Sequence, residues 1–344
     1  MTCLQDLWDR FGMLSDNIWI NTIIFVVLFN FGLYLVQGRT VCLNKLKDKC
    51  IIITGCDSGI GKATLEKLLV RECMQVIAIF LSKEVALEFN KTWRSDRLKC
   101  VQCDLRNEDQ VSKISKQALK QNPNLFALVN IAGIIKAGDS IIMEHSDLEE
   151  VMRVNFYGTV LLTQAFLPTL IRNKGRIIMT STILARLALP GLPAYTASKL
   201  ALEGYTECLR RETKLLGLKV ITIRPPQTRT KLISNLWQSY RESFSNAGQL
   251  NRQMLGGEYL KKVTRGTMRK ATEATAISPE AVAETIISAI LASHPSPTYW
   301  VGWFSKFIAL PLSVFPAFLA DFLLVYGNRF LFGIKPTHVS AMKP

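Results

Sequence analysis

Two residues, Tyr195 and Lys199, have the types and the spacing needed to move a proton. They lie four positions apart in a stretch with a helical pattern, so both side chains share one face of the helix. A free tyrosine has a pKa of about 10, which is high for acid–base work at neutral pH, but a fixed ammonium stabilises the phenolate and lowers that pKa. We therefore expect a proton-transfer pair. The same spacing also occurs by chance on solvated helices, so the context decides.

A glycine-rich turn earlier in the chain supplies part of that context. An apolar run at 50–54 leads into Thr54-Gly55-Cys56-Asp57-Ser58-Gly59-Ile60-Gly61, and a helical pattern begins at Lys62. Glycines let the backbone turn tightly and approach a pyrophosphate, while a new helix offers free N–H groups and the positive end of its dipole. Glycine also marks ordinary turns, but strand, turn and helix in this order predict a mononucleotide-binding site.

The elements that must position these residues follow an alternating pattern. Short β-branched runs alternate with longer helical stretches, which predicts a parallel sheet covered by helices on both faces. The near-continuous apolar character of the runs fits strands buried on both faces. The expected fold is α/β, a doubly wound parallel sheet of Rossmann type with about seven strands, within residues 47–303. The candidate strands are 50–54, 75–81, 99–103, 126–131, 176–181, 219–223 and 298–301.

These motifs resemble those of the short-chain dehydrogenase/reductase family. The glycine pattern G-x-x-x-G-x-G, Asp104 after the third strand, Asn130-Ile131-Ala132-Gly133 after the fourth, Asn155 in a helix, and Tyr195 with Lys199 fall in the family order across residues 47–303. The phrase at 54–59 and the aromatic, proline-containing C-terminus look like the branch of retinol, 17β-hydroxysteroid and 3-hydroxybutyrate dehydrogenases. The resemblance implies a nicotinamide-dependent oxidoreductase that acts on CH–OH groups.

The resemblance also implies roles for individual residues. Lys199 would bind the nicotinamide ribose, Asp104 the adenine and Thr230 the carboxamide of the cofactor. Asn155 would help to hold a water molecule in a proton relay. The alternative role of Asp104 is to cap the end of a strand, and that of Asn155 is to form a hydrogen bond inside a helix. The expected catalytic residues are Tyr195, Lys199, Thr182 and Asn155. The expected cofactor-binding residues are Gly55, Asp57, Ser58, Gly59, Ile60, Gly61, Asp104, Asn130, Ala132, Gly133, Tyr195, Lys199 and Thr230.

Three departures from the family pattern surround the expected site. The serine that holds the substrate oxygen is replaced by Thr182, and Ser181 one residue earlier is the alternative. Threonine supplies the same hydroxyl with a stiffer side chain, so we favour Thr182. Ile131 replaces a family asparagine, and Pro226 replaces a glycine and removes an N–H donor near the nicotinamide. A non-catalytic, nucleotide-binding membrane scaffold is therefore the rival interpretation.

The choice of cofactor depends on charge near the adenosine ribose, where an acidic residue favours NAD and a basic one favours NADP. The end of the second strand, at 80–82, offers neither charge. Asp57 lies in the glycine turn, where relatives that bind the 2′-phosphate often carry a basic residue nearby, so Asp57 favours NAD. Lys83 is a basic residue close to the end of the second strand and favours NADP. We expect NAD, with NADP left open.

The N-terminal region has the pattern of a membrane anchor. Residues 18–36 carry no charge and are almost wholly apolar, close to the roughly 20 residues that cross a bilayer as a helix, and residues 1–17 form an acidic tail. Basic residues after 36 place the main domain on the cytosolic side, and we expect the endoplasmic reticulum membrane. A signal peptide or a buried core helix is the alternative.

The C-terminal part predicts an apolar substrate. Residues 231–277 form an amphipathic stretch where family members place a substrate lid, and residues 304–334 form a hydrophobic segment, interrupted by prolines, that either lies at the membrane or packs on the domain. A lid of this kind beside a membrane favours a hydrophobic alcohol such as a steroid or retinoid, with a small 3-hydroxybutyrate-type acid as the alternative.

The charge balance and the positions of cysteine and histidine indicate which partners and metals to expect. Lys and Arg number 42 against 27 Asp and Glu, which favours an anionic surface, and we expect membrane lipid because no nucleic-acid motif accompanies the basic residues. The eight cysteines read as free thiols, and the three histidines match no ligand pattern, so no metal is expected. A homodimer is a further candidate partner, although the sequence does not identify the oligomeric state.

Overall fold

Seven parallel strands form the centre of the molecule. The computed structural model describes residues 46–71, 74–265 and 276–326. The sheet has the order β3-β2-β1-β4-β5-β6-β7, and every neighbouring pair is parallel. Each predicted strand is present within one residue at either end. The strands are β1 (Cys50–Thr54), β2 (Gln75–Phe80), β3 (Leu98–Gln102), β4 (Leu125–Asn130), β5 (Arg176–Thr180), β6 (Lys219–Arg224) and β7 (Thr298–Trp300).

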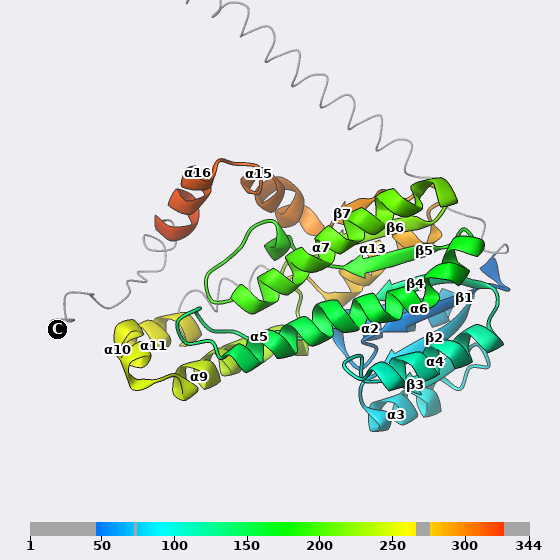
Figure 1. Cartoon of the computed structure of the whole chain (residues 1–344), viewed down its shortest axis with the longest axis horizontal. Helices are drawn as coiled ribbons and strands as arrows, with labels where there is room; N and C mark the ends of the chain where they lie inside the picture. The colour runs from blue at the N-terminus through cyan, green and yellow to red at the C-terminus, as the bar shows by residue number, and fades with distance from the viewer. Residues whose placement is uncertain (1–45, 72–73, 266–275, 327–344) are drawn as a thin grey trace, which may run out of the picture.

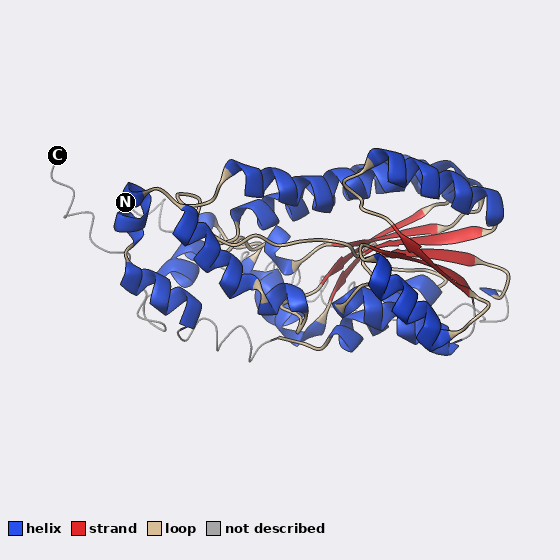
Figure 2. Ribbon diagram, turned by 90° about the horizontal axis from the view of Figure 1, so that it is seen from below, coloured by secondary structure: helices blue, strands red, loops and turns tan. Residues whose placement is uncertain are grey.

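Helices cover both faces of this sheet, as Figure 2 shows. One face packs against α2 (Gly59–Arg71), α3 (Lys83–Trp93) and α13 (Pro279–Leu291). The other face packs against α4 (Glu108–Gln121), α6 (Thr159–Arg172) and α7 (Pro193–Thr213). Alternate residues of one strand enter different cores: Ile51 and Ile53 enter the first, and Ile52 enters the second. This explains the continuous apolar runs, because both faces of the central strands are buried.

The order of the strands places a ligand site between β1 and β4. The chain moves from β1 outward to β2 and β3, and then crosses back to β4 on the other side of β1. In doubly wound sheets the crevice beyond the carboxyl ends of the strands at such a reversal binds the ligand. The glycine turn follows β1, and Asn130 ends β4, so the sequence motifs meet at this crevice.

Two further groups of helices lie beyond the carboxyl ends of the strands (Figure 1). The predicted lid contains α8 (Lys231–Ser234), α9 (Leu236–Asn246), α10 (Gln249–Leu255) and α11 (Gly257–Arg265). The C-terminal segment contains α14 (Gly302–Phe304), a π turn (Ser305–Ala309), α15 (Leu310–Leu312), α16 (Ala317–Asp321) and a second π turn (Phe322–Tyr326). The lid has its own small apolar core, which includes Ile142, Trp237 and Val263.

The predicted anchor at 18–36 lies outside the described residues, as do 266–275 of the lid and 327–334 of the C-terminal segment. Within the described ranges, one helical stretch, His145–Arg172, is long and apolar enough to cross a membrane. It joins α5 (His145–Met152), a π turn (Arg153–Gly158) and α6. Leu162, Phe166 and Leu170 of this stretch are fully buried against the sheet, so it is a core helix of the domain.

Candidate active site

The glycine turn between β1 and α2 leaves no room for larger side chains. Gly55 has φ +73°, and a Cβ there would lie 2.8 Å from the backbone of Ala132. A Cβ on Gly61 would lie 2.0 Å from the carbonyl oxygen of Gly55. Thr54 Oγ1 accepts hydrogen bonds from the N–H groups of Ile131 (3.0 Å) and Ala132 (3.1 Å), which fixes the turn against the end of β4. This cradle at a helix N-terminus fits a pyrophosphate.

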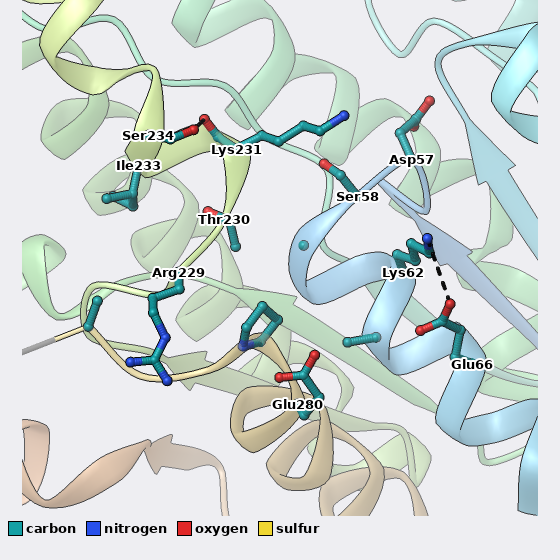
Figure 3. Close-up of a pocket in the computed structure, with 14 residues that line it drawn as sticks. Asp57, Ser58, Lys62, Glu66, Arg229, Thr230, Lys231, Ile233, Ser234 and Glu280 are labelled. Atoms are coloured by element: carbon teal, nitrogen blue, oxygen red, sulfur yellow. Dashed lines mark hydrogen bonds and ion pairs between the residues drawn. The ribbon is translucent and has the colours of Figure 1, made fainter. Parts of the chain in front are cut away.

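An outer pocket of about 620 Å³ lies beside the turn (Figure 3). Asp57 and Ser58 line one side, and Thr230 and Lys231, at the start of the lid, line the other; the side chain of Lys231 extends toward the turn. A Cβ on Gly59 would lie 2.7 Å from Thr230 Cγ2, so the lid begins in contact with the turn. The pocket has the size and the polar walls to hold the phosphates and adenosine of a dinucleotide.

The fold brings a carboxylate to the end of β2, where the local sequence has none. Asp57 Oδ2 accepts a hydrogen bond from Leu81 N and Oδ1 accepts one from Ser82 N, both at 2.9 Å. Ser82 is in turn the N-cap of α3. In this fold the adenosine ribose lies beside the end of the second strand, and a negative charge there disfavours a 2′-phosphate. Asp57 is thus the acidic residue that the sequence argument did not find at 80–82.

An inner pocket of about 410 Å³ adjoins the outer one, since Thr230 and Ile233 line both. Thr182, Tyr195 and Lys199 contribute hydroxyl and ammonium groups to its wall. Most of the remaining lining is apolar. It includes Ile135, Leu184, Leu189, Leu192, Leu236, Trp237, Val263, Phe304 and Leu324, drawn from the lid, the loops and the C-terminal segment. Three of the four predicted catalytic residues therefore meet in a largely apolar cavity of the kind that binds a hydrophobic molecule, and Asn155 does not line it.

Tyr195 is held as a phenol. Burial raises the pKa of Tyr195 to about 12, and a hydrogen bond from Thr182 opposes that rise. Lys199 Nζ lies 5.9 Å from the centroid of the tyrosine ring. The pKa of Tyr195 thus moves in the opposite direction to the one expected from Lys199, because the removal of the hydroxyl from water dominates. In this state Tyr195 can donate a proton.

Lys199 is buried on the face of α7 that meets β5. Its Nζ donates a hydrogen bond to the carbonyl oxygen of Thr180 at 2.9 Å. Burial lowers the pKa of Lys199 to about 8, and the carboxylate of Glu203, one turn further along the helix, opposes that change. The lysine is thus anchored by the sheet, with Tyr195 one turn before it on the same helix.

Asn155 lies in the π turn between α5 and α6. Its Oδ1 accepts a hydrogen bond from Ile134 N (2.8 Å), and its Nδ2 donates to Ile134 O (2.9 Å) and Ser198 Oγ (3.0 Å). A Cβ on Gly133 would lie 3.1 Å from Asn155 Oδ1 and 3.5 Å from Lys199 Nζ. Asn155 therefore fixes the loop after β4 beside the lysine, and its part in a water relay stays a prediction.

The structure distinguishes between the two candidate hydroxyls. Thr182 Oγ1 accepts a hydrogen bond from Leu184 N at 3.3 Å, and the Thr182 side chain also acts to lower the pKa of Tyr195. Ser181 Oγ is buried and has no hydrogen-bond partner among the described residues. Both residues border the inner pocket, but Thr182 is the one placed beside the tyrosine hydroxyl. The role of Thr182 in binding the substrate oxygen stays a prediction.

The remaining predicted residues lie around the same crevice. Asn130 Nδ2 donates to Thr163 Oγ1 at 3.1 Å, which ties β4 to α6. The carboxylate of Asp104 accepts hydrogen bonds from the backbone and guanidinium of Arg106, so it caps the end of β3; its bond to an adenine stays a prediction. The guanidinium of Arg106 also holds the pKa of Asp104 below its usual range.

The loop after β6, which carries the proline replacement at Pro226, is hydrogen-bonded to the turn after β5. The carbonyl oxygen of Pro225 accepts a hydrogen bond from Ile183 N at 3.1 Å, and the carbonyl oxygen of Pro226 accepts one from Thr228 Oγ1 at 3.0 Å. Thr230 Oγ1 then donates to Thr228 O at 3.2 Å. The loop beside the site is thus braced by its own carbonyl groups.

Sequence reasoning missed two polar clusters near the site. Glu203 is buried and receives hydrogen bonds from Arg186 and Arg224. The carboxylate of Asp139 accepts hydrogen bonds from the hydroxyls of Tyr240 and Tyr259, which ties α9 and α11 to the loop after β4. Glu203 could have been flagged, because it shares the helical face of Tyr195 and Lys199; no sequence pattern points to the Asp139 cluster.

Comparison with known proteins identifies the family. The family model described as short chain dehydrogenase matches residues 49–241. "Retinol dehydrogenase 16" of Mus musculus is 31% identical over 296 residues, covering 83% of this chain and 90% of that protein. "17-beta-hydroxysteroid dehydrogenase type 6" of Homo sapiens is 30% identical over 314 residues, covering 89% and 96%. The chain belongs to the short-chain dehydrogenase family, which confirms the resemblance. It is a nicotinamide-dependent oxidoreductase that acts on CH–OH groups.

Solved structures confirm the fold. A short chain dehydrogenase from Burkholderia cenocepacia, in complex with NADP, matches with a TM-score of 0.60 at 24% identity and covers 80% of this chain and 97% of that one. A short-chain dehydrogenase from Streptomyces avermitilis matches with a TM-score of 0.64 at 22% identity and covers 81% and 97%.

Proposed function

We propose that this protein is a membrane-anchored dehydrogenase that uses NAD to interconvert a hydrophobic alcohol and its carbonyl form, such as a retinoid or a steroid. The observation that carries the proposal is the inner pocket, where Tyr195, Thr182 and Lys199 meet in an otherwise mostly apolar cavity beside the glycine turn. The names of the relatives, which are retinol and 17β-hydroxysteroid dehydrogenases, support this class of substrate.

The residues of the chain supply the proton step. A bound nicotinamide supplies or accepts the hydride, and the glycine turn, Asp57, Thr230 and Lys199 are the groups that would hold the dinucleotide. When a carbonyl is reduced, Tyr195 donates its hydroxyl proton to the substrate oxygen, and Thr182 donates a hydrogen bond to the same oxygen. When an alcohol is oxidised, the proton returns to the tyrosine oxygen. The raised pKa of Tyr195 keeps its hydroxyl protonated at neutral pH, as the proton-donating step requires.

The preference for NAD rests on Asp57. Its carboxylate lies at the end of β2, hydrogen-bonded to the two backbone N–H groups that follow the strand. The 2′-phosphate of NADP would meet this negative charge, whereas the 2′-hydroxyl of NAD can donate a hydrogen bond to it.

Membrane attachment is supported by two parts of the chain. Residues 18–36 have the length and the composition of a spanning helix, and the basic residues that follow favour an anchor with the domain in the cytosol, at the endoplasmic reticulum. The described C-terminal segment exposes large apolar side chains to solvent. These are Trp303, Phe307, Ile308, Leu310, Val314, Phe315, Phe318, Phe322 and Leu323. Because Phe304 and Leu324 of the same segment line the inner pocket, we expect the substrate to enter from the lipid side.

The test is a substrate panel on the full chain in detergent. All-trans-retinol, hydroxysteroids and 3-hydroxybutyrate are each offered with NAD and with NADP, and the carbonyl forms are offered with the reduced cofactors. We expect turnover of a retinoid or steroid with NAD or NADH. Activity on 3-hydroxybutyrate alone would favour the small-acid alternative, and tight NADH binding without turnover on the panel would favour the scaffold.

A further inference from the structure

Glu203 occupies an unusual position for a carboxylate. It lies on α7 four residues after Lys199 and eight after Tyr195, so the three side chains follow one face of the helix. The side chain of Glu203 is only 3% exposed. A carboxylate removed from water is strongly unfavourable without charged partners, so such a residue persists where its contacts compensate.

Two arginines from other elements supply those contacts. Arg224 is the last residue of β6; its Nε donates to Glu203 Oε1 and its Nη2 donates to Oε2, both at 2.8 Å. The guanidinium of Arg224 also lies over the ring of Trp300, 4.8 Å from its centroid. Arg186 follows the short turn after β5, and its Nε donates to Glu203 Oε2 at 2.9 Å. The bidentate pair fixes the orientation of the carboxylate, and the second arginine uses one of its remaining lone pairs.

The network connects the three elements that shape the reacting end of the pocket. Arg186 ends the turn that begins at Thr182. Arg224 directly precedes Pro225, whose carbonyl oxygen accepts a hydrogen bond from Ile183 N. Glu203 belongs to the helix that carries Tyr195 and Lys199. One carboxylate thus joins the hydroxyl that meets the substrate oxygen, the loop beside the cofactor and the helix of the proton-transfer pair.

We propose that Glu203 is a positioning residue that, with Arg186 and Arg224, sets both the place and the charge of Lys199. This inference rests on the proposed function, because it gives Lys199 a part in the reaction. Glu203 contacts neither pocket and acts only through its neighbours. The two guanidinium groups fix the Glu203 carboxylate and partly offset its charge, while the carboxylate itself, one helical turn from the ammonium, favours the protonated lysine.

The groups that face Lys199 are few within the described residues. The tyrosine and Glu203 face it from α7, the carbonyl oxygen of Thr180 from β5, and the amide of Asn155 from the π turn. The acidic side chains of α5, the other helix packed against α7, are engaged elsewhere. Asp147 and Glu150 pair with Lys136, and Glu149 pairs with His145. Glu203 is therefore the carboxylate that acts on the lysine in this part of the chain.

Substitutions of Glu203 and of Arg186 should change the pKa of Lys199 in opposite directions. Glu203→Gln removes the negative charge, so the lysine should lose its proton at a lower pH than in the wild type. Arg186→Gln removes a positive charge that partly neutralises Glu203, so the pKa of the lysine should rise. A purely structural ion pair predicts something else, namely that both variants loosen the same packing and act in the same direction.

Glu207→Gln is the matched control. Glu207 lies one turn beyond Glu203 on the same helix and pairs with Arg210 and Arg211 at the surface, so the change in charge is the same. Its side chain is 42% exposed. Glu207 is eight residues from Lys199, and solvent and its own two arginines screen its charge, so this variant should leave the pKa of Lys199 unchanged. Arg186 is exposed to a similar extent, 43%, but it acts through its direct hydrogen bond to the buried Glu203 carboxylate.

The experiment measures how fast Lys199 is acetylated by acetic anhydride as a function of pH, read by peptide mass spectrometry on the full chain in detergent. In parallel, single-turnover hydride transfer is followed over the same pH range. We expect the labelling midpoint to fall in Glu203→Gln and to rise in Arg186→Gln. The basic limb of the rate profile should move with each midpoint, and the hydride-transfer rate of Glu203→Gln at pH 8 should fall about tenfold or more.

Opposite shifts, with the control unchanged, support the proposal. Midpoints that stay equal to the wild type, or that move in the same direction in both variants, overturn it. If Glu203→Gln does not fold, the upward shift in Arg186→Gln, which keeps the pair with Arg224, decides alone. The labelling experiment does not require turnover. A wild type without activity would contradict the proposed function, and the labelling midpoints of Lys199 would still show whether Glu203 and Arg186 control the charge of the lysine.

Discussion

Replacing Lys199 by methionine removes a buried ammonium that the folded state keeps at a cost. The ordinary pKa of a lysine is 10.5, and burial lowers that of Lys199 to about 8. The difference corresponds to about 3 kcal/mol, at about 1.36 kcal/mol per pH unit. Methionine has a similar length and needs no charge, but it leaves the carbonyl oxygen of Thr180 without its donor, which costs about 1–2 kcal/mol. At pH 7 we therefore expect the variant to be about 1–2 kcal/mol more stable than the wild type and to be inactive.

The pH dependence gives the sharper test. The folded pKa lies below the unfolded one, so the unfolded chain binds more protons between about pH 8 and 10.5, and the wild type gains stability as the pH rises through that window. Urea unfolding in detergent, followed by tryptophan fluorescence at several pH values, measures both proteins. Other groups that titrate in the same way in the wild type and in Lys199→Met contribute equally to the two free energies of unfolding, so they cancel when one is subtracted from the other. The advantage of Lys199→Met should shrink by about 3 kcal/mol across the window. A variant that is less stable at pH 7, by a margin that does not change with pH, would refute this reasoning.

Three further substitutions test other parts of the site. Gly61→Ala should abolish NADH binding in a fluorescence titration, because its Cβ would lie 2.0 Å from the carbonyl oxygen of Gly55; retained affinity would show that the turn can widen. Thr182→Val should lower the hydride-transfer rate about 100-fold, since it removes a donor to the substrate oxygen, while Ser181→Ala should change it less than about twofold; the reverse order would give the role to Ser181. Asp57→Ser should reduce the preference for NAD over NADP about tenfold in kcat/KM, as expected when a charge near the 2′ position is lost; an unchanged ratio would exclude Asp57 from cofactor choice.

The fold was predictable because its signals are local. The strands are continuous apolar runs that end in glycine or polar residues, and burial on both faces of a parallel sheet requires that composition. The glycine turn was predictable for the same reason, since strand, turn and helix are adjacent in the chain. The π turn at Arg153–Gly158 was expected only as helix, because its extra residue leaves no mark in the hydrophobic period.

The sequence predicted which residues form the candidate site, but it predicted their pKa values and charged neighbours less well. Tyr195 and Lys199 could be paired from their spacing, but the pKa of Tyr195 depends on how much of the tertiary structure covers it. Asp57 reaches the end of β2 only because the sheet places β1 and β2 side by side. Likewise, Arg186 and Arg224 come from separate elements, and only the folded chain brings them to Glu203.

The replacement Tyr195→Phe tests the central claim most directly. The full chain in detergent is mixed with NADH and the most active carbonyl substrate of the panel, and hydride transfer is followed in a single turnover. Phenylalanine keeps the ring but removes the proton donor, so the rate should fall at least about 100-fold while the affinity for NADH stays within about twofold. A variant that transfers hydride at the wild-type rate would contradict the account.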